Sequence, residues 1–86
     1  MNALNELSAA LVSVKDRGNM LKFLSEIHTP SELKDLALRW RLLKMLTQGY
    51  PQREIAGKLK ISLCKITRGS RLLKSRGSVT KELIKG

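Results

Sequence analysis

This chain of 86 residues has few of the residues that make disulfides, metal sites and β-sheets. It contains one cysteine, Cys64, and one histidine, so it cannot form an internal disulfide and has too few ligands for a typical zinc site. Aromatic residues make up only 3% of the sequence, and the hydrophobic 42% is therefore mostly Leu, Ile, Val, Met and Ala. Such a composition favours helices over a small sandwich or barrel.

Long apolar runs and enzyme motifs are also missing. No stretch approaches the roughly 18 apolar residues that a membrane span needs, and the first residues carry no basic leader. His28 lies next to a predicted helix start, and no paired carboxylates, phosphate-binding glycine loop or nucleophile constellation is recognisable. We therefore expect a cytoplasmic protein that is not an enzyme, has no membrane partner and needs no metal or other cofactor.

Acidic residues are few, 7 against 17 basic ones, and the charge is unevenly placed. Residues 1–37 have a net charge of −1, whereas residues 38–86 have a net charge of +11. This asymmetry predicts a polyanionic partner for the second half. A solvated basic surface is the plainer alternative, and a membrane surface is disfavoured because turns divide the basic part into short helices.

The apolar residues repeat with helical spacing throughout, which predicts an all-α fold. We expect Gly18 to separate the first two helices. The next helix has a clear start signal, with Thr29 as N-cap, Pro30 at the first helical position and Glu32 completing a capping box. Gly49 is expected to end it. Its predicted apolar stripe is Leu33, Leu36, Ala37, Trp40, Leu43 and Met45.

Two short helices joined by a tight turn are predicted between Gln52 and Lys74, a stretch with seven basic residues and one acidic residue. Their spacing fits a helix-turn-helix, in which a few apolar residues lock the two helices at a steep angle. Ser62 is expected to cap the second helix. Lys60 falls where the turn often has a left-handed glycine, and a lysine there costs roughly 1 kcal/mol or more. The residues expected to be buried are Ile55, Ala56, Leu59, Ile61 and Ile66.

The remaining positions of this motif are free to face DNA. In a helix-turn-helix the second helix enters the major groove, and the first residues of that helix contact base edges. In this sequence those residues are Leu63, Cys64, Lys65 and Thr67. Phosphate contacts are predicted for Arg53, Lys58, Lys60 and Arg71. The full predicted DNA-binding set is Gln52, Arg53, Lys58, Lys60, Leu63, Cys64, Lys65, Thr67, Arg71 and Lys74. An ordinary helical hairpin is the alternative for the motif, and a small buried hydrophobe is the alternative for Cys64.

The segments "QREIA" and "ITRGSRLLK" closely resemble the Trp repressor family, and the likeness extends upstream to "LALRWRLLKMLTQG" and to the "TP" at Thr29 and Pro30. It covers about residues 27–74. The resemblance implies an intertwined all-helical homodimer that binds a double-stranded operator when L-tryptophan is present, and so represses tryptophan genes. We therefore expect a single domain, 1–86, made of dimerisation helices (1–28), a core helix (29–49), the helix-turn-helix (52–74) and a C-terminal helix (78–85).

The resemblance also implies a ligand site. Arg39 and Arg68 match two arginines that sandwich the indole ring and meet its carboxylate, as a flat guanidinium fork is able to do. Thr29 matches a threonine that contacts the carboxylate, and Gly69 a glycine that leaves room for the ring. Phosphate contact or plain surface charge is the alternative for the two arginines, and helix capping is the alternative for Thr29.

This sequence departs from the family pattern near the ligand. Leu72 replaces a serine that helps to hold the ligand amine, and Lys65 replaces a threonine in the recognition helix. Two functions therefore remain open. One is a repressor gated by L-tryptophan or a similar indole as corepressor. The other is an ungated DNA-binding module, such as a transposase or recombinase targeting domain or a repressor switched by a protein partner.

Overall fold

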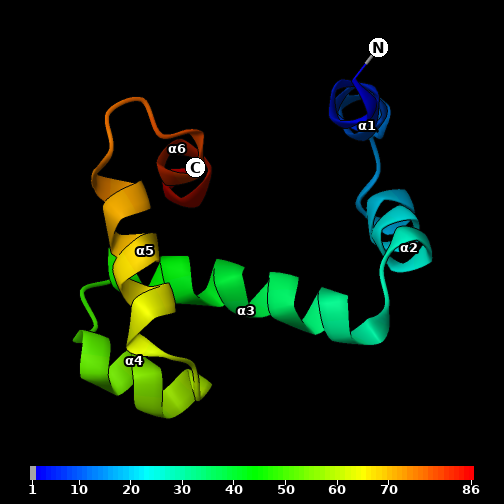
Figure 1. Ribbon diagram of the computed structural model, residues 1–86. Coiled ribbons are helices and arrows are strands. Elements are labelled where there is room, and N and C mark those ends of the chain that lie inside the picture. Colours follow the sequence, from blue (N-terminus) through cyan, green and yellow to red (C-terminus); the bar gives the residue numbers. More distant parts are fainter. Residues whose placement is uncertain (1) are drawn as a thin grey trace. The chain divides into compact units, whose positions relative to one another are not determined.

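The computed structural model describes residues 2–86, and these form six helices and no strand (Figure 1). The helices are α1 Ala3–Ser13, α2 Arg17–Ile27, α3 Pro30–Thr47, α4 Gln52–Leu59, α5 Leu63–Lys74 and α6 Val79–Lys85. The all-α prediction is confirmed. The chain divides into two compact units, one that ends at Lys34 and one that comprises Asp35–Gly86.

The first unit contains α1, α2 and the first residues of α3. The Asn2 side chain caps α1 by accepting a hydrogen bond from the Leu4 amide, and the Asp16 carboxylate caps α2 by accepting one from the Asn19 amide. The expected break at Gly18 is wrong, because α2 begins at Arg17 and includes that glycine. Helix α1 ends at Ser13 instead, and the Asp16 carboxylate supplies the start signal of α2.

The helices α1 and α2 bury none of their residues in a single copy of the chain. Leu4, Val12 and Leu21 are 67%, 84% and 62% exposed, respectively. Isolated surface leucines are common, but here whole helices have an apolar stripe and no core. These helices therefore lack, within one copy, the packing that normally stabilises a helix of this length.

The helix α3 begins and ends with the predicted signals. The Thr29 amide donates to Glu32 Oε1 over 2.8 Å, and the Glu32 amide donates to Thr29 Oγ1 over 3.1 Å, which completes the capping box. At the other end the Tyr50 amide donates to the Met45 carbonyl and the Gly49 amide to the Leu46 carbonyl. With Gly49 at φ 90°, this is a Schellman ending.

The second unit has a small core where the C-terminal half of α3 meets the helix-turn-helix. Ile55 of α4 and Ile66 of α5 are fully buried, as predicted, and Ala56, Leu59 and Ile61 pack partly buried around them. The α3 contribution is Leu42, Met45 and Leu46. Of the predicted α3 stripe, Met45 is buried in this core, whereas Leu36 and Trp40 are 40% and 44% exposed in a single copy of the chain.

Candidate nucleic-acid interface

The helix-turn-helix has the predicted boundaries. A three-residue turn, Lys60–Ser62, joins α4 to α5. The Ser62 side chain caps α5 by accepting a hydrogen bond from the Lys65 amide at 3.4 Å. Lys60 adopts the left-handed conformation, with φ 53° and ψ 47°, at the position where a glycine is common. The turn therefore forms despite an unfavourable residue.

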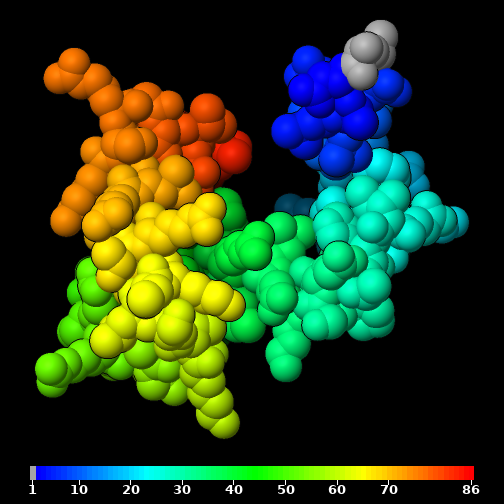
Figure 2. All heavy atoms as spheres, viewed as in Figure 1, coloured from blue at the N-terminus to red at the C-terminus, as the bar shows by residue number. Residues whose placement is uncertain are grey.

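The recognition helix α5 has one buried face and one exposed face. Ile66 and Gly69 are buried and Leu73 is half-buried, so residues three and four apart form a stripe that packs inward. The rest of the helix is largely exposed, and long side chains stand out from the α4–α6 part of the surface, coloured green to red in Figure 2. The like charge of this stretch is tolerable because the basic side chains reach solvent.

All ten residues of the predicted DNA-binding set are exposed: Gln52, Arg53, Lys58, Lys60, Leu63, Cys64, Lys65, Thr67, Arg71 and Lys74. Leu63 is 52% exposed, as a base-edge contact requires, and the alternative of a buried Cys64 is wrong for a single copy. The Thr67 hydroxyl donates to the Leu63 carbonyl over 2.9 Å. It therefore presents a methyl group and an oxygen acceptor to a partner, and its proton is already used.

Lys58 differs from the other lysines of the set because it already has neighbours. Its Nζ lies 3.8 Å from Glu54 Oε1 and 5.1 Å from the centroid of the Tyr50 ring. Charge attraction and the cation–π contact both hold the ammonium beside α4. This cluster was not predicted, although Glu54 and Lys58 lie four residues apart on a helix, a spacing that is a recognisable signal for an ion pair.

Gly69 has a packing role that the family resemblance did not predict. A Cβ atom at this position would lie 3.3 Å from Leu46 Cδ1 and 3.4 Å from Leu43 Cδ2, both on α3. The absence of a side chain therefore allows α5 to approach α3 closely. The proposed role in making room for an aromatic ligand stays a prediction, and it does not need to be invoked to explain this glycine.

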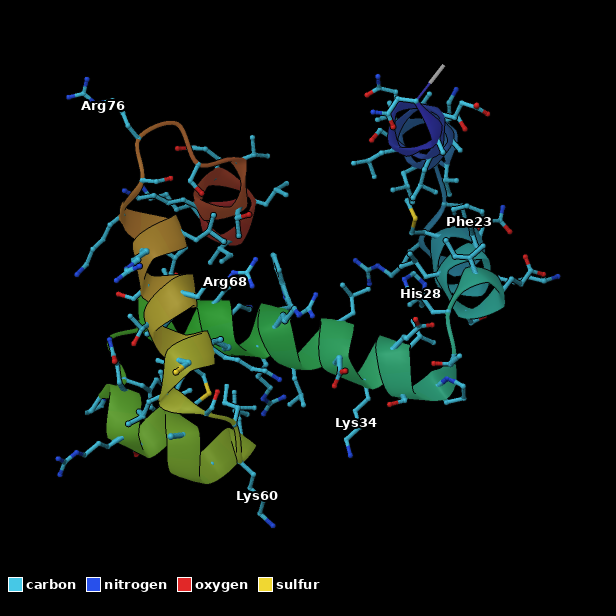
Figure 3. All side chains as sticks on the ribbon, in the orientation of Figure 1. Phe23, His28, Lys34, Lys60, Arg68 and Arg76 are labelled. Atoms are coloured by element: carbon cyan, nitrogen blue, oxygen red, sulfur yellow. The ribbon has the colours of Figure 1, made fainter. Side chains whose placement is uncertain are left out.

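The other predicted ligand residues lie on three segments. Arg39 is exposed on α3 and Arg68 on α5, and Figure 3 shows Arg68 leaving α5 on the side of α3. Thr29 Oγ1 accepts from the Glu32 amide, so this side chain already takes part in the capping box of α3. The hydrogen bonds from the Thr29 amide and hydroxyl, with a smaller effect of the His28 charge, lower the pKa of Glu32 below its ordinary value.

Residues 2–86 contain no group of three or more His, Cys, Asp or Glu side chains placed to hold a metal ion. Within the same range, none of the helices combines the length and the apolar character needed to cross a membrane.

The fold and the exposed face of α5 define a helix-turn-helix protein. The chain matches the model of the Trp repressor protein family over residues 2–85. It is 40% identical over 68 residues to the Trp operon repressor homolog of Chlamydia trachomatis serovar D, a match covering 73% of this chain and 72% of the relative. The homolog from Actinobacillus succinogenes is 35% identical over 75 residues, which is 86% of this chain and 74% of the relative. No solved structure matches.

The chain belongs to the Trp repressor family. This is a regulatory DNA-binding family, so the chain is a transcriptional repressor and not an enzyme.

Proposed function

We propose that this chain acts in the cytoplasm as a homodimeric repressor that binds a specific double-stranded operator through α5, and that L-tryptophan or a similar indole is its corepressor. The observation that carries the proposal is the division of α5 into a packed stripe and an exposed face. Ile66 and Gly69 fix the helix against α3, while Leu63, Cys64 and Lys65 stay exposed in its first turn. The first turn of a recognition helix is the part that reads base edges.

The proposed readers divide by chemistry. Lys65 suits a guanine edge, which offers acceptors in the major groove, and Leu63 or Cys64 suits a thymine methyl group. Arg53, at the start of α4, suits a phosphate, because the first helix of the motif crosses the DNA backbone. Base choice and general affinity would then depend on different residues.

Dimerisation is supported by the apolar side chains that a single copy leaves exposed. The stripes of α1 and α2 and the exposed side chains of Leu36 and Trp40 have no core to enter within one chain. A second copy would bury them and would present two recognition helices to two half-sites about one helical turn apart. Light scattering tests this directly, and a stably folded monomer at micromolar concentration would contradict it.

The corepressor role rests on Arg39 and Arg68. These are exposed guanidinium groups on two different helices, and one of them belongs to the helix proposed to read DNA. A planar indole carboxylate offers each a ring face or an anionic oxygen. A ligand bound by both arginines would link α5 to α3 and so set the angle at which α5 enters the major groove.

One observation favours an ungated DNA-binding module instead. Leu72, which is 41% exposed, stands where the family pattern has a serine for the ligand amine. A leucine offers no hydrogen-bond acceptor, and this loss would weaken recognition of an amino acid more than of an indole acid without the amine.

The experiment is a selection from a pool of randomised duplexes, with the purified protein and with or without L-tryptophan. The proposal predicts enrichment of a two-fold symmetric site that is stronger with the ligand present. Enrichment of the same site to the same extent in both arms would support the ungated module. A pool that stays random in both arms, while the protein is folded, would contradict sequence-specific binding altogether.

A further inference from the structure

Lys60 is the one residue other than glycine with a positive φ among residues 2–86. The other two positions with positive φ in this range are Gly49 and Gly77, so glycine occupies every left-handed position except that of Lys60. The left-handed conformation is unfavourable for a residue with a Cβ atom, and Asn or Asp tolerates it better because a short polar side chain bonds the local backbone. A lysine has neither advantage.

Among residues 2–86 no side-chain hydrogen bond, ion pair or cation–π contact explains why this position is a lysine. The Lys60 side chain is exposed, and Figure 3 shows it extending from the turn into solvent. The ion pair found in the described part of the chain joins Glu54 to Lys58, the lysine two residues before Lys60. Backbone strain of this kind, when no local interaction offsets it, indicates a function.

The position of Lys60 indicates which function. In a helix-turn-helix on DNA, the first helix crosses the backbone and the second enters the major groove at its N-terminus. The turn between them therefore lies at the edge of the groove, beside the phosphates. We propose that Lys60 is a positioning residue that binds a backbone phosphate next to the half-site and sets the depth and register of α5, at a cost to the stability of the fold. This inference rests on the proposed DNA-binding function.

Lys58 provides a matched comparison. Both lysines are exposed and both belong to the predicted DNA-binding set, but Lys58 is already held by Glu54 and by the Tyr50 ring. A phosphate would have to compete with these neighbours, whereas Lys60 has no competing partner among residues 2–86. The two lysines should therefore differ in their contribution to DNA binding, although a simple count of charges treats them alike.

The experiment uses four variants of the full chain, Lys60→Met, Lys60→Gly, Lys60→Arg and Lys58→Met, and a mixed-sequence duplex of about three helical turns. Methionine removes the charge and keeps the Cβ strain, glycine removes both, and arginine keeps both. The readouts are the melting temperature and the slope of log Kd against log salt concentration. Because phosphate contacts carry no sequence information, the duplex need not contain the operator.

The expected result separates strain from charge. Lys60→Gly should raise the melting temperature by about 4–8 °C, the shift expected for relief of strain of this size in a small domain, and Lys60→Met should leave it nearly unchanged. Both should reduce the salt slope by about 0.9 for each copy bound and weaken binding roughly two- to five-fold per copy. Lys60→Arg should bind like the wild type, and Lys58→Met should change the slope less than Lys60→Met.

Three outcomes would overturn the inference. These are an unchanged salt slope in Lys60→Met, a slope change in Lys58→Met as large as that in Lys60→Met, and a Lys60→Gly variant that is no more stable than the wild type. Failure of the proposed function looks different, because the wild type itself would then show no salt-dependent binding to the duplex.

Discussion

Replacing Ile66 with alanine should be among the most destabilising single changes in the second unit. Its side chain is fully buried, and it lies in the cluster of Leu42, Met45 and Ile55 that joins α3, α4 and α5. Truncation removes three side-chain carbons from this cluster and leaves a cavity. The neighbours are themselves few, so little material is available to refill the space.

Buried isoleucine-to-alanine changes cost about 2–5 kcal/mol, which includes the lost transfer energy and the cavity. Because the core of this unit has only four buried hydrophobic residues, and Ile66 is one of the two that are fully buried, we expect a loss of about 3 kcal/mol or more. Small domains have roughly 5–15 kcal/mol of total stability, so the loss would be a large fraction of it. The variant Ile66→Val, which removes one carbon, should cost about 0.5–1.5 kcal/mol.

The assay is urea unfolding followed by far-ultraviolet circular dichroism at one fixed protein concentration, because subunit association would make the midpoint depend on concentration. Leu63→Ala is the matched control: it also truncates a large aliphatic side chain on α5, but one that is 52% exposed. It should change stability by no more than about 0.5 kcal/mol. An Ile66→Ala loss below about 1 kcal/mol, or equal losses in the two variants, would refute the assignment of the packed face of α5.

Three further predictions concern charge and recognition. The hydrogen bonds from Thr29 lower the pKa of Glu32 and so stabilise its charged form in the folded state. This contribution to folding stability is present above the unfolded-state pKa and is lost as the pH falls through the folded-state pKa. Unfolding curves recorded from neutral pH to well below 4.5 should therefore show a smaller acid-dependent loss of stability for Glu32→Gln than for the wild type. In operator titrations Lys65→Ala should cost about 1–3 kcal/mol of binding free energy, specifically at the base pair that Lys65 contacts. Arg53→Ala should weaken binding to operator and to random DNA alike. If both variants lost equal affinity for both DNAs, Lys65 would not be a base-contacting residue. Leu72→Ser should tighten L-tryptophan binding in calorimetry by about 0.5–1.5 kcal/mol, the usual worth of one hydrogen bond, and an unchanged affinity would show that position 72 does not meet the ligand amine.

Local signals predicted the helix-turn-helix well. The boundaries of α4 and α5 follow from Ser62 and from the short turn, and the burial of Ile55 and Ile66 follows from helical spacing. The capping box at Thr29 likewise needs only four residues of sequence. Each of these features depends on interactions within one or two turns of a helix, so the sequence contains the information needed to predict them.

Features that depend on contacts between distant segments were not predicted from the sequence. Helix α3 is rich in leucine around much of its circumference, so periodicity alone did not show that Leu42 and Leu46 enter the core while Leu36 and Trp40 stay exposed. The close approach of α5 to α3 at Gly69 is a tertiary contact of the same kind. The start of α2 differs from the prediction for a local reason: the Asp16 carboxylate caps the helix, and Gly18 is accommodated within its first turn.

Operator titration at zero and at saturating L-tryptophan, on the wild type and on Arg39→Ala and Arg68→Ala, tests the proposed repressor most directly. A ligand held by both arginines would couple the two sites, and a coupling of about 1–3 kcal/mol corresponds to a 5- to 150-fold gain in operator affinity. Because coupling is reciprocal, operator DNA should tighten tryptophan binding by the same factor. The account predicts this gain in the wild type and its loss in both variants. Equal operator affinity of the wild type with and without tryptophan would contradict the gate and leave the ungated DNA-binding module as the function.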